Sequence, residues 1–134
     1  NDDAALRSYS IFTAFGGPFL AARTEADMQP AMDAMTFTPF LDAQMDLNRR
    51  IDIVAEVEEI RVPTLVTGCT HDQMVPIRHQ RHLFGAIVDA RIAEIPTGHA
   101  VVFERPSELS HHIQQFLDAP TLHEAGTIIP IPAP

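Results

Sequence analysis

A short apolar run from Val62 to Thr67 limits what this chain can fold into. The run is rich in β-branched residues, has Pro63 near its start and is bounded by Gly68, which is typical of a strand buried on both faces. Such strands occur in parallel sheets whose two faces are covered by helices. The run therefore predicts an α/β protein.

The segments that follow this strand support the same fold class. Residues 78–88 carry apolar side chains at helical spacing, and Arg91 to Ile95 alternates in the manner of a second, shorter strand. Strand, helix and strand in this length predict a right-handed βαβ unit with two parallel strands. Pro106 and Ser107 open a final helix, in which Leu109, Ile113, Phe116 and Leu117 are expected to share one face.

Each of the two predicted strands runs into a turn that ends on a chemically active side chain. Asp72 follows the first strand and His99 follows the second. Parallel strands lie about 4.8 Å apart and end at the same sheet edge, so the two side chains are expected to come within reach of each other. A carboxylate that holds one imidazole nitrogen prepares the other nitrogen to take a proton. The strand order therefore predicts an acid–base pair.

The residues around these turns resemble a known superfamily. The segments IRVPTLVTGCTHDQMVP and ARIAEIPTGHAVVFERPSELSHHIQQFL are similar to the C-terminal third of the α/β hydrolases. That superfamily has an I-x-V-P-T-L-V strand, a turn with D-x-x-V-P that carries the triad acid, and a G-H-A turn that carries the triad histidine. The resemblance spans residues 60–118, and several spaced signatures agree in order.

The resemblance implies a division of the chain and two catalytic roles. Residues 60–118 would form the C-terminal βαβα part of a hydrolase core, with parallel strands and flanking helices. Residues 1–59 would be a helical, cap-like region, in which Pro30 is expected to split one helix, and residues 119–134 a Pro-rich tail that wraps the surface or is mobile. Asp72 stands where the superfamily has its acid and His99 where it has its general base. No cofactor or metal is implied.

The sequence departs from the superfamily in its nucleophile. The serine there lies on a G-x-S-x-G turn ahead of the acid and the histidine, and this sequence has no such motif. The four serines lack the flanking glycines: Ser8, Ser10, Ser107 and Ser110. Two apolar strands alone also leave sheet edges and faces uncovered. We therefore expect an N-terminal segment or a companion chain that carries further strands and the nucleophilic serine.

On this basis the chain is predicted to belong to a serine-type hydrolase that acts on a small-molecule ester, lactone or other acyl substrate. An acyltransferase uses the same residues, so the sequence does not separate the two reactions. A third hypothesis is a non-catalytic, hydrolase-like subunit with an interaction or regulatory role, which the missing G-x-S-x-G motif favours.

Composition and net charge limit which classes of molecule this chain is expected to bind. The formal charge of −9 and nine scattered Lys and Arg residues argue against a nucleic-acid partner, because no basic patch could neutralise phosphates. No apolar segment approaches the length of a membrane span, so we expect no membrane partner. A single cysteine gives no sign of an oxidising compartment, and a cytoplasmic location is predicted.

Several other residues have a second interpretation. Cys69 is either a nucleophile beside His99 or, as we favour, a small buried hydrophobe at the strand end. A metal site at His71, Asp72, His79 and His82 is disfavoured, because this spacing matches no strong zinc pattern. His111 and His112 are expected on a solvated face of the last helix. Glu104 and Arg105 are expected to anchor that helix. Gly16–Gly17 is predicted to form a turn.

Overall fold

The computed structural model describes residues 3–36 and 40–130. Residues 1–2 and 37–39 of the predicted cap-like region and residues 131–134 of the tail lie outside this description. The elements in chain order are α1 (Asp3–Ala14), α2 (Gly17–Ala21), α3 (Glu25–Ala34), α4 (Leu41–Arg50), α5 (Val54–Glu58), β1 (Thr64–Cys69), α6 (Arg78–Ala86), β2 (Ala90–Ile95), α7 (Val101–Glu104), α8 (Pro106–Asp118) and β3 (Ile128–Ile129).

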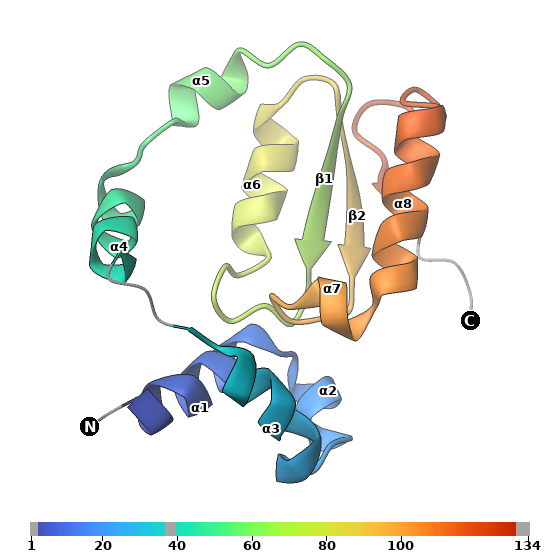
Figure 1. Ribbon diagram of the computed structural model, residues 1–134. Coiled ribbons are helices and arrows are strands. Elements are labelled where there is room, and N and C mark those ends of the chain that lie inside the picture. Colours follow the sequence, from blue (N-terminus) through green and yellow to red (C-terminus); the bar gives the residue numbers. More distant parts are fainter. Residues whose placement is uncertain (1–2, 37–39, 131–134) are drawn as a thin grey trace.

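A parallel sheet in the order β1-β2-β3 forms the centre of the structure. β1 and β2 pair in register from Thr64 opposite Ala90 to Cys69 opposite Ile95, with α6 as their connection. Figure 1 shows α6 on one side of these strands and α8 on the other. The predicted βαβ unit and the α/β fold class are confirmed, although the first strand begins at Thr64 rather than at Val62.

The third strand comes from the tail, where no strand was predicted. Ile128 and Ile129 pair with Ile92 and Ala93 of β2. Gly126, with a φ of 81°, makes the turn that brings this segment back onto the sheet, and its N–H donates to the carbonyl of Ala90. Two residues are too few to show a strand period, so only the tertiary pairing creates β3.

One apolar cluster lies between the sheet, α5 and the C-terminal end of α6. Val57, Val66, Ile87, Ala90 and Ile92 are buried together there. All of β2 is buried except Glu94, which is half-buried and accepts two hydrogen bonds from Arg81 of α6. β2 is therefore the central strand, whereas β1 is only partly buried along its length.

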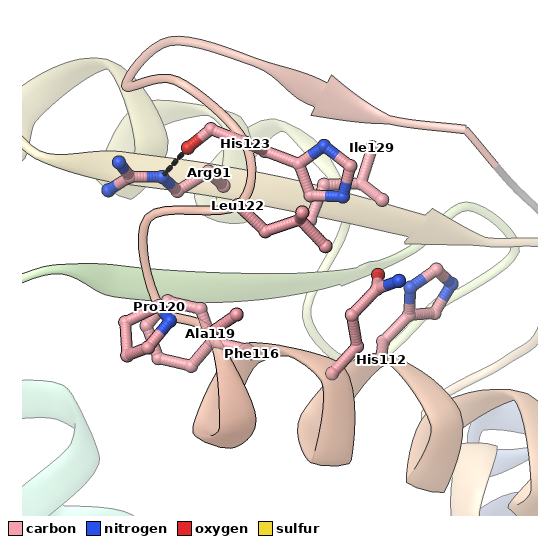
Figure 2. A pocket seen from close by; sticks show the side chains of 9 residues that line it. Arg91, His112, Phe116, Ala119, Pro120, Leu122, His123 and Ile129 are labelled. Carbon is pink, nitrogen blue, oxygen red and sulfur yellow. Dashed lines mark hydrogen bonds between the residues drawn. The ribbon is translucent and has the colours of Figure 1, made fainter.

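The buried face of α8 differs from the prediction. Ile113 and Leu117 are 42% and 65% exposed, whereas His112 is only 2% exposed, so the expectation of a solvated His112 is wrong. Figure 2 shows His112 facing a small cavity between α8, β2 and the tail, with His123 and Arg91 nearby. The helix therefore turns a different face toward the sheet than the predicted one. Packing against β2 and the tail decides which face this is, and the spacing of apolar residues along α8 carries no information about that packing.

The burial of His112 predicts a pH-dependent stability. Burial lowers the pKa of the His112 imidazole below its ordinary value, and the charge of His111 adds to this effect. Between the folded and the unfolded pKa the unfolded chain binds more protons, so the free energy of unfolding falls as the pH is lowered through about 6.5.

Urea unfolding at a series of pH values measures this dependence. His112→Leu is expected to flatten the acid side of the profile, whereas His79→Leu, at an exposed position of α6, is expected to leave it unchanged. An unchanged slope in His112→Leu would contradict the assignment.

The first three helices form a second apolar cluster around Ile11, Phe15 and Met28. The helix expected from Phe19 onward is interrupted between α2 and α3, where Thr24 and Asp27 form a capping box, and not at Pro30. Pro30 lies inside α3, so the predicted split at this residue is wrong. A proline removes one N–H donor and bends a helix more readily than it ends it when both sides are held by packing and caps.

Helix α4 stands apart from the rest of the chain in Figure 1. Its apolar residues Met45 and Leu47 are exposed, as are Ile51 and Ile53 in the connection to α5. Within residues 3–36 and 40–130, no helix is both long enough and apolar enough to cross a membrane.

Candidate active site

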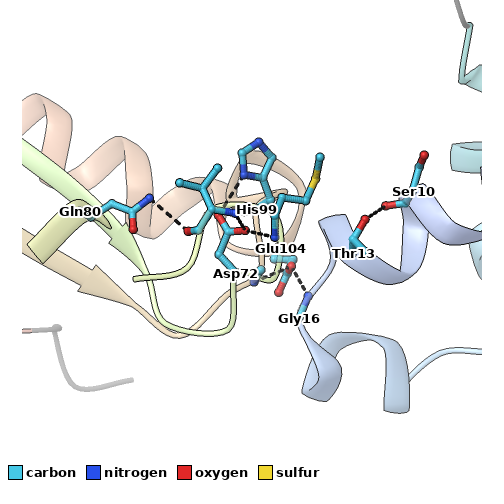
Figure 3. Close-up of polar contacts among 10 residues, drawn as sticks. Ser10, Thr13, Gly16, Asp72, Gln80, His99 and Glu104 are labelled. Atoms are coloured by element: carbon cyan, nitrogen blue, oxygen red, sulfur yellow. Dashed lines mark hydrogen bonds and ion pairs between the residues drawn. The ribbon is translucent and has the colours of Figure 1, made fainter. Parts of the chain in front are cut away.

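Asp72 and His99 lie at the carboxyl ends of β1 and β2 and are in contact. The Oδ2 atom of Asp72 lies 2.9 Å from Nδ1 of His99. Figure 3 shows the two side chains pointing toward each other from their separate turns. The strand order predicts this meeting, and the structure contains it.

The meeting depends on backbone pairing that continues past the ends of the strands. The N–H of Thr70 donates to the carbonyl of Ile95, and the N–H of His71 donates to the carbonyl of Thr97. Thr97 is fully buried. Backbone hydrogen bonds therefore join the two turns independently of the side chains. This pairing fixes the distance between Asp72 and His99.

The Asp72 carboxylate is held by its own turn. Its Oδ1 atom accepts hydrogen bonds from the N–H groups of Met74 and Val75, each at 2.8 Å. The side chain is only 3% exposed. Donors directed at one oxygen leave the other oxygen free for the imidazole, so the carboxylate is fixed in both position and orientation.

The His99 ring has one bound and one accessible nitrogen. The side chain is 47% exposed, and the neutral ring that donates Nδ1–H to Asp72 presents Nε2 as an acceptor. No serine hydroxyl among the described residues bonds to this ring; Ser10, for example, donates to the carbonyl of Leu6 within its own helix.

A large apolar cavity lies next to the histidine turn. Its volume is about 610 Å³, and its walls come from α1, α2, α3 and α7. Ala100, which directly follows His99, lines it together with Phe103, Phe15 and Met28. Through Ala100 the His99 turn therefore adjoins an open apolar pocket of a size suited to a small molecule.

The histidine turn is in backbone contact with the turn between α1 and α2. A Cβ atom placed on Gly98 would lie 2.3 Å from the Gly16 nitrogen, and the Ala100 N–H donates to the carbonyl of Ala14. Oε1 of Glu104 accepts from the N–H groups of both Gly16 and Gly98. From the sequence, Glu104 was predicted only to anchor the last helix. This bridge was not predicted, because no local sequence pattern indicates that the N–H groups of two residues so far apart in the chain share one acceptor.

Cys69 does not have the environment of a reactive nucleophile. The residue is buried, and this burial raises the pKa of its thiol; Thr97 acts in the opposite direction through a hydrogen bond, and the charges of Asp72 and Glu104 raise the pKa further. A raised pKa leaves little thiolate at neutral pH. This environment favours the interpretation of Cys69 as a small buried hydrophobe at the strand end.

The alternative metal site receives no support from the geometry. Among the described residues, no three His, Cys, Asp or Glu side chains come together as a set of ligands. His79 and His82 are exposed on α6, whereas Asp72 is engaged with His99.

Comparison with known proteins agrees with the α/β fold of the chain. No protein-family model matches the chain. MGS-M2, an α/β hydrolase from a Medee basin deep-sea metagenome library, superposes with a TM-score of 0.72 at 21% identity, over 87% of this chain and 45% of that one. The fold is that of the α/β hydrolases.

Two proteins are similar to this chain in sequence. Pyrrolizixenacetamide deacetylase from Xenorhabdus hominickii is 28% identical over 119 residues, which cover 87% of this chain and 45% of the deacetylase. Polyketide synthase ThaQ from Burkholderia thailandensis is 34% identical over 89 residues, which cover 66% of this chain and 4% of the synthase. The chain thus spans about half the length of the deacetylase and of MGS-M2, and it corresponds to the C-terminal portion of the hydrolase fold.

The close contact between the two turns predicts that one added methyl group at Gly98 destabilises the protein. Gly98→Ala would place its Cβ atom against the backbone of residues 14–16, so it should lower the free energy of unfolding by about 1–3 kcal/mol. Gly85→Ala is a matched control, because a Cβ atom on that glycine of α6 meets nothing within 4 Å.

Urea denaturation compares the two glycine variants. The control should be neutral or stabilising, by up to about 1 kcal/mol, because alanine favours helix more than glycine does. Equal unfolding midpoints for the two variants would refute the close contact.

The environment of Cys69 predicts slow alkylation. Iodoacetamide at pH 8 should modify Cys69 in the folded protein at least about tenfold more slowly than in urea-unfolded protein, because both the accessibility and the thiolate fraction are low. The extent of modification is followed by intact mass. Equal rates in the two states would restore the nucleophile hypothesis.

Proposed function

We propose that this chain supplies the acid and the general base of a serine-type α/β hydrolase. The observation that carries the proposal is the 2.9 Å contact between Asp72 Oδ2 and His99 Nδ1 at the carboxyl ends of adjacent parallel strands. In open α/β sheets this edge is where ligands bind and reactions occur. Asp72 would orient the ring, and His99 would move the proton.

The proposed mechanism follows from the tautomer that Asp72 selects. Nε2 of His99 takes the proton from a serine hydroxyl as the serine oxygen attacks the acyl carbon, and the buried Asp72 carboxylate stabilises the imidazolium that forms. The imidazolium then gives that proton to the leaving group, which departs with the electron pair of the broken bond. His99 then takes a proton from a water molecule as the water oxygen attacks the acyl-enzyme carbon, and it returns that proton to the serine oxygen as the bond between acyl carbon and serine breaks and the acid leaves.

The substrate we propose is a small molecule with an acyl group in ester, lactone or amide linkage. The apolar cavity beside Ala100 supports a substrate whose acyl or leaving group is apolar. The similarity to a deacetylase supports acyl transfer to water rather than to another acceptor. Acyl transfer to a second substrate would use the same two residues and is the alternative within this fold.

The nucleophile is proposed to come from an N-terminal segment or from a companion chain. Among the described residues β1 pairs only with β2, so the other edge of this apolar strand is available for a further strand. The exposed apolar residues of α4 and of its connection to α5 are a second surface that such a segment would cover. The cytoplasmic location expected from the single cysteine stays a prediction.

The native protein, isolated with whatever chain accompanies it, tests this proposal through a fluorescent serine-reactive phosphonate. A serine in the complete assembly should label, and His99→Ala should lower both labelling rate and kcat by about 10³-fold or more. Asp72→Asn should act in the same direction, because an amide favours the wrong ring tautomer. His79→Ala, an exposed histidine of α6, is the matched control.

The outcomes separate the hypotheses. Full labelling in His99→Ala would remove the general-base assignment. Native material that consists of this chain alone, never labels and hydrolyses no acyl ester would favour a non-catalytic, hydrolase-like interaction subunit instead.

A further inference from the structure

We infer that Glu104 is a positioning residue that locks the turn carrying His99 to the turn between α1 and α2. Its effect on turnover rests on the proposed function, whereas its effect on the two turns does not. Glu104 and Gly16, which this contact joins, lie 88 positions apart in the sequence.

One carboxylate oxygen makes both connections. Oε1 of Glu104 accepts from the Gly16 N–H at 2.8 Å and from the Gly98 N–H at 2.9 Å. Figure 3 shows the Glu104 carboxylate lying between the two turns. Hydrogen bonds to an ionised carboxylate are shorter and stronger than those between neutral groups, and this carboxylate is half-buried, where solvent competes less.

Both donors belong to glycines, which explains how a single oxygen reaches them. A Cβ atom on Gly98 would lie 2.5 Å from the carbonyl carbon of Phe15 and 2.7 Å from the carbonyl oxygen of Ala14. A Cβ atom on Gly16 would lie 2.9 Å from the Gly98 nitrogen. The two backbones therefore touch, and their N–H groups converge on one acceptor.

The residues before and after His99 are both hydrogen-bonded to groups outside their own turn or at its end. Glu104 holds the N–H of residue 98, and the carbonyl of Ala14 accepts from the N–H of residue 100. The backbone of His99 is thus fixed by the α1–α2 turn, while Asp72 fixes its ring. Phe15 and Ala100, on either side of this contact, also line the apolar cavity.

The test compares Glu104→Ala and Glu104→Gln in the complete native protein. The matched control is Glu108→Ala: Glu108 is also half-buried, but it pairs with Arg105 at 3.0 Å and has no bond to either turn. The readouts are amide hydrogen exchange at Gly16 and Gly98, the pH profile of kcat/KM, and kcat and KM measured separately.

Glu104→Ala should speed exchange at both glycine amides by about tenfold or more and lower kcat by a similar factor, with KM changed less than about threefold. Glu104→Gln keeps an acceptor oxygen without the charge, so it should exchange a few-fold faster than wild type and recover most of the turnover. Glu108→Ala should leave exchange at Gly16 and Gly98 unchanged.

Wild-type exchange at both glycines in Glu104→Ala, or losses matched by Glu108→Ala, would overturn the lock. If Glu104→Ala does not fold, Glu104→Gln decides, because unchanged exchange in that variant would equally overturn it. If His99→Ala retains full activity, the proposed function fails, yet the exchange measurements still decide whether Glu104 joins the two turns.

Discussion

The parallel pairing of β1 with β2 is the interaction on which the rest of the structure depends. It extends beyond the strands themselves, since the carbonyls of Ile95 and Thr97 accept from Thr70 and His71 in the following turn. Backbone hydrogen bonds of this kind fix the distance between the two strands, and this distance determines how close the side chains at their ends can come. Asp72 and His99 meet because the main chain beneath them is already joined.

The sequence predicted the part of the structure that local patterns encode. The apolar run that forms β1, the helical spacing of α6 and the alternation that marks β2 were sufficient to place Asp72 and His99 at one edge. Strand order and side-chain reach are consequences of chain geometry, so they could be predicted from one sequence.

The features that the sequence missed are created by contacts between distant segments. β3 exists because Ile129 finds a place beside β2, and two residues carry no period of their own. The burial of His112 depends on how α8 is rotated against the sheet and the tail. Glu104 is bonded to Gly16, and nothing in the residues around either one indicates the other.

The contact between Gly16 and Gly98 has a consequence for how this protein can change over generations. Neither turn has room for a side chain at the point of contact, so the two glycines cannot drift independently of each other. An insertion in either turn would separate the backbones and remove a donor from Glu104 at the same time. Loop length, which is usually the most variable property of such proteins, is therefore restricted at this place by two segments at once.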